Sequence, residues 1–257
     1  MKKILITLIG LAALSLAGVQ GQVTINSVSF TYTQNFDTLA ASGTNNTWTD
    51  NATLAGWYAN RTAYISTNGS STTGALNSLG AASSSDRALG ATTSGTTTTV
   101  NFGMVLRNAC GFSINLSDIS LSYTGEMWRI NTNIQSLAFE YQVSSSAITS
   151  ITSGTYTANT NLNFTSPGNG TAAAVDGSSP AYRTSFSNVA LTPSGVLNDG
   201  DYLAIRWTKN GTNSPALGID DLTISANAAA VPEPTTWALI GLGSAFVLWR
   251  VRRQPVC

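Results

Sequence analysis

The side chains of this chain that could do chemistry are mainly carboxylates and aromatic rings. The sequence contains no histidine, and its cysteines are Cys110 and Cys257. A thiol or hydroxyl nucleophile needs a neighbouring base to activate it, and histidine is the usual one. Chemistry that depends on an activated nucleophile is therefore disfavoured. The acidic residues are the remaining candidates for catalysis or for metal binding.

Three aspartates form a candidate calcium site. Asp37 lies near the start of the central region, and Asp220 with Asp221 lies near its end. If the first and last strands of the fold are neighbours, these carboxylates approach one another, and oxygen-rich clusters of this kind bind calcium. The alternative is that each aspartate caps backbone amides in a turn and stays solvated. A structural calcium ion is the one cofactor that the sequence suggests.

Two glutamates, Glu126 and Glu140, offer the pair of carboxylates that a glycosidase uses as acid and as base or nucleophile. They lie on different expected strands, and the closely spaced acidic motif of sandwich-fold glycosidases is absent. We therefore expect a noncatalytic protein, with a secreted, glycosidase-like hydrolase as the alternative. The favoured role of Glu126 is a partly buried ion pair with Arg87 or Arg129.

Four aromatic residues are candidates for a platform on which sugar rings stack. They are Trp48, Trp57, Tyr58 and Trp128. An exposed aromatic face suits a pyranose ring, whereas a buried one belongs to the core. We favour the core, because large aromatic residues are usually well buried.

The elements that must position these side chains are strands. Alternation of apolar and polar residues, the period of a half-buried strand, is clear in four segments. These are 100–106, 119–123, 137–143 and 203–207. Weaker strand signals lie in 23–32, 54–65, 182–191 and 217–225. The sequence therefore predicts an all-β fold, an antiparallel β-sandwich in which a jelly roll is the favoured version.

The stretches between the strands are rich in Ser, Thr, Gly and Ala. Residues 68–85 and 144–160 are interpreted as solvated loops. The threonine-rich stretch 91–99 continues into the strand at 100–106, so its last residues are expected to pair in a sheet.

The first 21 residues have the pattern of a secretory signal peptide. Two lysines follow Met1, residues 4–16 are apolar, and small residues end the segment. We expect cleavage before Gln22 or after Ala17, which makes the secretion translocon and signal peptidase partners. A retained N-terminal anchor is the alternative, although the apolar run is short for a membrane span.

The charge of the central region restricts its partners. Residues 22–230 contain seven basic and eleven acidic residues, a net charge near −4, because the other basic residues lie in the two ends of the chain. Nucleic-acid binding depends on neutralising phosphates with lysine and arginine. No nucleic-acid partner is therefore expected. Residues 22–226 are assigned to one exported domain.

The last residues place three signals in a fixed order. Residues 227–234 form a linker that ends in Val231, Pro232, Glu233 and Pro234, an apolar stretch follows, and Arg250, Arg252 and Arg253 come last. A helix over 235–251 would span about 25 Å, slightly less than a bilayer core of about 30 Å. Residues 235–257 are therefore predicted to be a transmembrane helix with a basic tail, which the positive-inside rule holds in the cytoplasm. A buried helix of a soluble domain is the alternative.

This order of Pro-Glu-Pro, apolar stretch and arginines resembles the PEP-CTERM sorting signal of bacterial envelope and exopolysaccharide proteins. The resemblance implies a membrane exosortase as the partner that recognises and processes the motif. It also implies a protein of the cell envelope or extracellular matrix. Such a protein is anchored in the membrane by its C-terminal helix before processing and then lies at the cell surface or outside the cell. A polysaccharide is a further candidate partner.

A looser resemblance covers much of the exported region. Its segments are 32–37, 50–58, 85–90, 123–129 and 216–222, which are similar to a β-sandwich module of secreted bacterial proteins. The last of them, with Ile219-Asp220-Asp221, is also similar to a strand of MAM-type and lectin-like jelly rolls. This resemblance implies a fold and no particular ligand, since one fold serves many functions.

Overall fold

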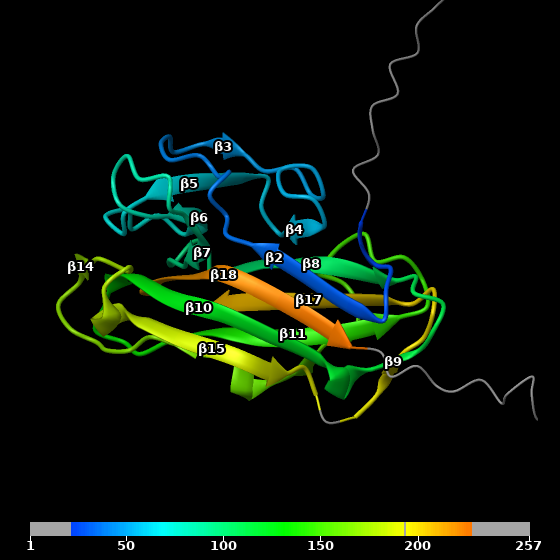
Figure 1. Cartoon of the computed structure of the whole chain (residues 1–257). Helices are drawn as coiled ribbons and strands as arrows, with labels where there is room; N and C mark the ends of the chain where they lie inside the picture. The colour runs from blue at the N-terminus through cyan, green and yellow to red at the C-terminus, as the bar shows by residue number, and fades with distance from the viewer. Residues whose placement is uncertain (1–21, 193, 228–257) are drawn as a thin grey trace, which may run out of the picture.

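The computed structural model describes residues 22–192 and 194–227, which fold into strands joined by loops (Figure 1). The described residues contain no α-helix. Their helical turns are the short 3-10 segments η1 (Leu116–Asp118), η2 (Thr160–Leu162) and η3 (Pro180–Tyr182). The predicted all-β class is confirmed.

The first sheet contains three of the four segments with the clearest alternation. Its strands follow in the order β1 (Val23–Ile25), β8 (Thr99–Asn108), β17 (Tyr202–Asn210), β11 (Ser136–Ser144) and β12 (Thr157–Ala158). In addition, β4 (Trp57–Ala59) pairs with β8, and β13 (Phe164–Thr165) pairs with β11. On β11 the side chains of Leu137, Phe139 and Tyr141 belong to the core, so Glu140 points to the outer face.

The second sheet is built around its longest neighbours, β10 and β18. Its strands follow in the order β14 (Ala173–Ala174), β10 (Ile119–Ile130), β18 (Ala216–Asn227), β7 (Ala88–Thr92), β6 (Ala75–Leu79), β5 (Ala63–Thr67) and β3 (Asn46–Thr47). In addition, β15 (Arg183–Ala190) pairs with β10, and β2 (Ser29–Gln34) pairs with β18. A separate small sheet joins β9 (Ile114–Asn115) to β16 (Val196–Leu197).

Strand β18 has hydrogen-bonded neighbours on both sides. Strand β10 pairs along its whole length, while on the other side β7 pairs with its first half and β2 with its second half. Figure 1 shows β7, β6, β5 and β3 continuing the sheet away from β18, towards the top of the view. Two pairings, β1 with β8 and β5 with β6, are parallel, and the others are antiparallel.

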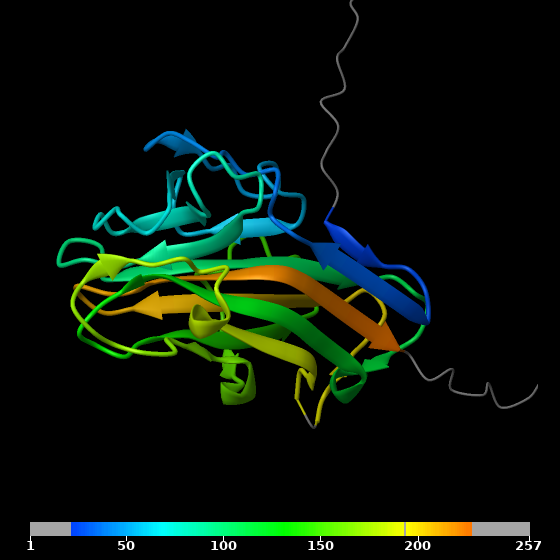
Figure 2. The same ribbon diagram turned by 60° about the vertical axis from the view of Figure 1, so that its left-hand side comes forward.

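The two sheets face each other across one apolar core, and the rotated view shows them as two layers (Figure 2). At its centre the fully buried Trp207 of the first sheet meets Tyr123 of the second, with ring centroids 5.5 Å apart. Trp57 and Phe102 stack on Trp207 at 6.3 and 6.1 Å, and Phe139 meets it edge-on at 5.2 Å. The described residues therefore share one large apolar core.

A β-bulge interrupts β18. The register of its pairing with β10 shifts so that Asp221 and Leu222 together oppose Tyr123. Asp221 has a φ of 50°, a left-handed conformation that aspartate adopts more readily than most residues. The extra residue resets the alternation. Ile219 and Leu222 therefore both belong to the core, while Asp220 points to the outer face.

The interpretation of residues 68–85 and 144–160 as loops was wrong in part. Strand β6 lies inside the first stretch, and β12 lies inside the second. All five residues of the neighbouring β7 are buried, so β7 is covered on both faces and shows no alternation of polar and apolar residues. The expected pairing at the end of the threonine-rich stretch is confirmed, since Thr99 pairs with Asn210.

Several expectations concern residues that lie outside those described. They are the signal peptide, the sorting motif with most of its linker, and the C-terminal transmembrane helix with its basic tail. Within residues 22–192 and 194–227, no helix is long and apolar enough to cross a membrane.

Candidate functional site

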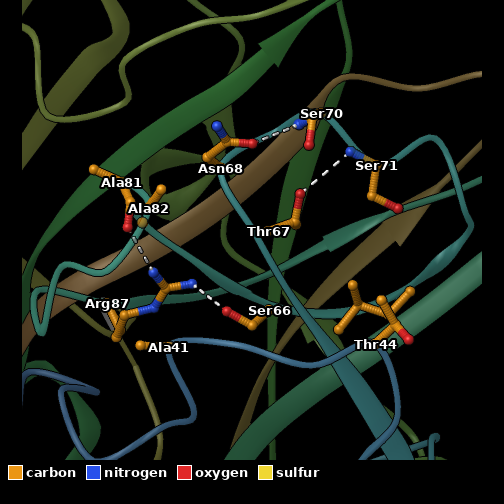
Figure 3. Close-up of a pocket in the computed structure, with 12 residues that line it drawn as sticks. Ala41, Thr44, Ser66, Thr67, Asn68, Ser70, Ser71, Ala81, Ala82 and Arg87 are labelled. Atoms are coloured by element: carbon orange, nitrogen blue, oxygen red, sulfur yellow. Dashed lines mark hydrogen bonds between the residues drawn. The ribbon is translucent and has the colours of Figure 1, made fainter.

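A polar hollow of about 350 Å³ opens beside the end of β5 (Figure 3). Its walls come from β5 and the turn after it, from the connection between β6 and β7, and from the residues before β3. Hydroxyl and amide side chains make up much of the lining: Thr44, Ser66, Thr67, Asn68, Ser70 and Ser71. These groups can donate and accept hydrogen bonds. The residues that line this hollow include no carboxylate and no thiol, so the lining suits a polar ligand better than hydrolytic chemistry.

The turn at the rim of the hollow is fixed by its own side chains. Asn68 Oδ1 accepts a hydrogen bond from the backbone N–H of Ser70 at 3.2 Å, and Thr67 Oγ1 accepts one from Ser71 N–H at 3.2 Å. Gly69 has a φ of 89°, and a Cβ atom there would collide with the carbonyl oxygen of Trp128 on β10. Only glycine fits this close approach, which holds the rim against the second sheet.

Arg87 lies at the floor of the hollow (Figure 3). Its Nε donates to Ser78 Oγ at 2.8 Å, Nη1 to Ala81 O at 3.3 Å, and Nη2 to Ser66 Oγ at 3.0 Å and to Ser78 O. All these acceptors are neutral, and burial lowers the pKa of the guanidinium group. Arg87 is 1% exposed, so it fastens the connection between β6 and β7 to the sheet and offers little charge to a ligand.

Replacing Arg87 with lysine is expected to destabilise the domain by about 2–3 kcal/mol, because one ammonium group cannot reach all the acceptors that the guanidinium fork joins. Thermal melting of the purified domain measures the loss. Arg107→Lys is the matched control, since Arg107 is exposed on β8 and a change there is expected to leave the melting temperature nearly unchanged. Equal melting temperatures for the two variants would show that the network around Arg87 contributes nothing.

Glu126 is buried on the outer face of the second sheet, and its expected ion pair is absent. Its Oε2 accepts a hydrogen bond from the indole Nε1 of Trp128 at 2.8 Å, which is possible because residues two apart on a strand share a face. Arg87 binds the neutral acceptors described above, and Arg129 donates to the carbonyl oxygen of Gly69 at 3.1 Å. The ion-pair prediction was therefore wrong.

Asp220 lies beside Glu126 on the same outer face, because Glu126 pairs with Gly218, two residues before Asp220 on β18. Burial raises the pKa of Asp220 to about 8 and that of Glu126 to about 7. Repulsion between the two carboxylates and from nearby Asp86 acts in the same direction. The pair therefore holds protons at pH values where ordinary carboxyl groups are ionised. Neither residue lines the hollow of Figure 3.

Glu140 does not form a catalytic pair with Glu126. Glu140 points outwards from the first sheet and Glu126 outwards from the second, so both layers of the sandwich separate them. Packed sheets alone lie about 10 Å apart, more than the separation of carboxyl groups in glycosidases. Glu140 instead forms an ion pair with Arg206 Nη2 at 2.8 Å and accepts a hydrogen bond from Thr208 at 3.1 Å.

Two of the three candidate calcium ligands, Asp37 and Asp220, make hydrogen bonds within the protein. The first strand of the fold, β1, pairs with β8, and the last, β18, pairs with β2. Asp37, which follows β2, accepts hydrogen bonds from Arg87 N–H at 3.1 Å and from Asn35 Nδ2 at 2.7 Å. Asp220 accepts one from the N–H of Asp221 at 2.7 Å. In the part of the chain that the structure describes, no group of three or more His, Cys, Asp or Glu is placed to hold a metal. Calcium binding stays a prediction. The contacts of Asp37 match the amide-capping alternative, whereas Asp220 caps an amide but is buried within β18.

The four candidate sugar-stacking residues are all buried. Trp48 is 3% exposed, Trp57 0%, Tyr58 6% and Trp128 3%. A ring that is covered on both faces offers no surface on which a sugar can stack. The burial of these residues agrees with the favoured expectation that they pack inside the protein, where Trp57 stacks on Trp207.

The sorting motif is the one predicted site that a comparison with known families supports. Residues 230–253 match the model of the PEP-CTERM protein-sorting motif. The match contains all residues assigned to the motif and the basic tail: Val231, Pro232, Glu233, Pro234, Arg250, Arg252 and Arg253. No curated protein matches the chain. The chain therefore carries a PEP-CTERM sorting motif, the signal of exported exosortase substrates, and the part of it that the structure describes is all-β.

Proposed function

We propose that this protein is a noncatalytic component of the bacterial cell envelope or extracellular matrix. The match of residues 230–253 to the sorting motif carries the proposal. The secretion translocon delivers the chain, and signal peptidase removes the leader. The C-terminal segment then holds the protein in the membrane until an exosortase processes the motif. The all-β domain is the part that acts outside the membrane.

Features of the described domain support a noncatalytic role. Glu126 and Glu140 lie on opposite outer faces, and the hollow of Figure 3 has no carboxylate in its lining. The hydrolase alternative makes a distinct prediction, namely that a screen of polysaccharide substrates finds turnover that Glu126→Gln abolishes. Absence of turnover in that screen is the result that the proposal expects.

The intact mass of the protein from its native envelope tests the sorting step. We expect a mature chain that begins at Gln22 or Gly18 and no longer contains Arg250 to Cys257. Replacing Pro232 with alanine is expected to leave the C-terminal residues in place, because the motif is the exosortase signal.

The matched control for this variant is Pro167→Ala, which changes an exposed proline of the domain and is expected to be processed normally. A native protein whose mass still includes Arg250 would contradict exosortase processing. Normal processing of the Pro232 variant would show that the enzyme does not read this proline.

A further inference from the structure

A second hollow, of about 310 Å³, lies at one end of the sandwich. It is formed by the end of β7 with the turn 92–95, by the end of β10, and by the turn 212–214 between β17 and β18, with Thr72 at its edge. Loops that a rigid sandwich holds together at one end are a common location for binding sites. This hollow is separate from the one around Arg87 and shares no lining residue with it.

Arg129 brings a positive charge to this hollow. It is half-buried, and its Nη1 donates to the carbonyl oxygen of Gly69 at 3.1 Å, which fixes the direction of the side chain. Within the described residues Arg129 has no ion-pair partner, although the exported region is acidic overall. The planar guanidinium group matches a carboxylate through two parallel hydrogen bonds. The guanidinium group of Arg129 makes one hydrogen bond within the described residues and keeps donors for a ligand. The guanidinium group of Arg87, in contrast, already donates to several neutral acceptors.

The rest of the lining is neutral and polar. Ser214 Oγ accepts a hydrogen bond from Thr93 N–H at 2.7 Å, and Asn131 Nδ2 donates to Asn213 O at 3.0 Å, so these contacts join the turns into one wall. Thr93 is 1% exposed, and its hydroxyl group has no hydrogen-bond partner among the described residues. Buried polar groups normally have a partner, so the Thr93 hydroxyl is a group of this lining whose hydrogen-bonding capacity is unused within the described residues.

We propose that this hollow binds a sugar acid, with the carboxylate on Arg129 and the ring hydroxyl groups on the threonine, serine and asparagine side chains around it. One cation surrounded by neutral donors and acceptors complements a ligand with one carboxylate and several hydroxyl groups. The volume lies at the lower end of the range of about 300–1,000 Å³ for small-molecule sites, which suits a single sugar ring. The inference rests on the proposed function only in that an envelope protein meets carbohydrate outside the cell.

Saturation-transfer NMR on the full chain, kept in a detergent without a sugar headgroup, tests the proposal with three probes. Glucuronate is expected to bind, while glucose and acetate bind at least about tenfold more weakly, since each offers only half of the complementary groups. Acetate binding as tight as that of glucuronate would reveal a simple anion site and overturn the proposal. Equal binding of glucose would overturn the role of Arg129, and absence of glucuronate binding would overturn the site.

Two kinds of variant locate the binding. Arg129→Gln is expected to weaken glucuronate binding at least about tenfold, and Arg129→Lys by less, because lysine keeps the charge and loses the fork. Gly95→Asp adds a carboxylate to the lining where no atom lies within 4 Å of the new Cβ, so the fold tolerates it and the ligand is repelled.

Gly168→Asp is the matched control for the glycine variant, because it adds the same charge at an equally open position outside the lining. It is expected to bind glucuronate like the unchanged protein. Equal affinities of Gly95→Asp and Gly168→Asp would overturn the site even if the Arg129 variants failed to fold. Absence of glucuronate binding would not contradict exosortase sorting, because the intact mass tests that step separately.

Discussion

Replacing Trp207 with alanine is expected to destabilise the domain by about 3–5 kcal/mol, the usual cost of removing a buried aromatic side chain. The indole is fully buried and contacts rings from both sheets, with Tyr123 at 5.5 Å across the core and Phe139 at 5.2 Å on the neighbouring strand. Its removal leaves a cavity between the layers, because strands on both sides hold the surrounding rings in place. Urea unfolding followed by circular dichroism measures the loss.

Phe112→Ala is the matched control for the tryptophan variant. Phe112 is 36% exposed, so its removal is expected to change the free energy of unfolding by less than about 0.5 kcal/mol. If Trp207→Ala also lowered the free energy of unfolding by less than about 0.5 kcal/mol, the packing of the two sheets would not depend on the central aromatic cluster.

Replacing Asp220 with asparagine is expected to stabilise the domain at pH 7.5, by about 2–5 kcal/mol, since each unit of pKa shift corresponds to about 1.4 kcal/mol. The wild-type carboxyl group must hold a proton or bury a charge in the folded state, and the amide avoids both. Asparagine can still accept the hydrogen bond from the N–H of Asp221, so the bulge keeps its cap. Thermal melting at pH 7.5 measures the gain.

Asp220, together with Glu126 and Lys209, determines how the stability of the domain changes with pH. The pKa of Asp220 rises from 3.8 to about 8 on folding, and that of Glu126 from 4.5 to about 7. Their stabilisation is therefore fully present below about pH 4 and is lost as the pH rises through 7 to 8. Burial lowers the pKa of Lys209 from 10.5 to about 7, so its contribution is present above 10.5 and is lost as the pH falls to 7. Together these groups place a minimum of stability near pH 7–8.

Melting temperatures at pH 5 and pH 7.5 test this dependence. The unchanged domain is expected to melt higher at pH 5, and Asp220→Asn is expected to reduce the difference. Asp199→Asn is the control, since Asp199 is exposed in the turn after β16 and its removal should leave the difference intact. A domain that melts higher at pH 7.5 than at pH 5 would contradict the burial of these carboxyl groups as the dominant effect.

The strands that alternate large apolar residues with polar or small ones could be predicted from the sequence, and a strand of mostly small residues could not. Strands β8, β11 and β17 alternate clearly, because each places a row of large apolar residues in the core and mostly polar or small residues on its other face, even where that face is also buried, as in β8 and β17. Strand β7 is buried on both faces and contains small residues, so neither alternation nor size distinguishes it from a loop. The bulge at Asp221 is also hidden, since it shifts the alternation within a strand that otherwise looks regular.

The contacts at the candidate sites also divide into those that the sequence could predict and those that it could not. The contact of Glu126 with Trp128 was accessible from the sequence, because two residues on one strand share a face. The acceptors of Arg87 were not, since Ser66 and Ser78 lie on strands whose pairing only the topology reveals. The sorting motif needed no fold at all, because its signal is a short contiguous stretch of sequence.

The position of β18 also determines how the domain carries a mechanical load. This strand ends at Asn227, three residues before the sorting motif begins, so a force applied through the tail enters the fold along it. The hydrogen bonds to β10 on one side and to β2 on the other run perpendicular to the strand. A pull along β18 loads these bonds together in shear, and they must break almost at once. A domain held at the cell surface by this end is thus attached through a strand that is hydrogen-bonded to neighbours on both sides.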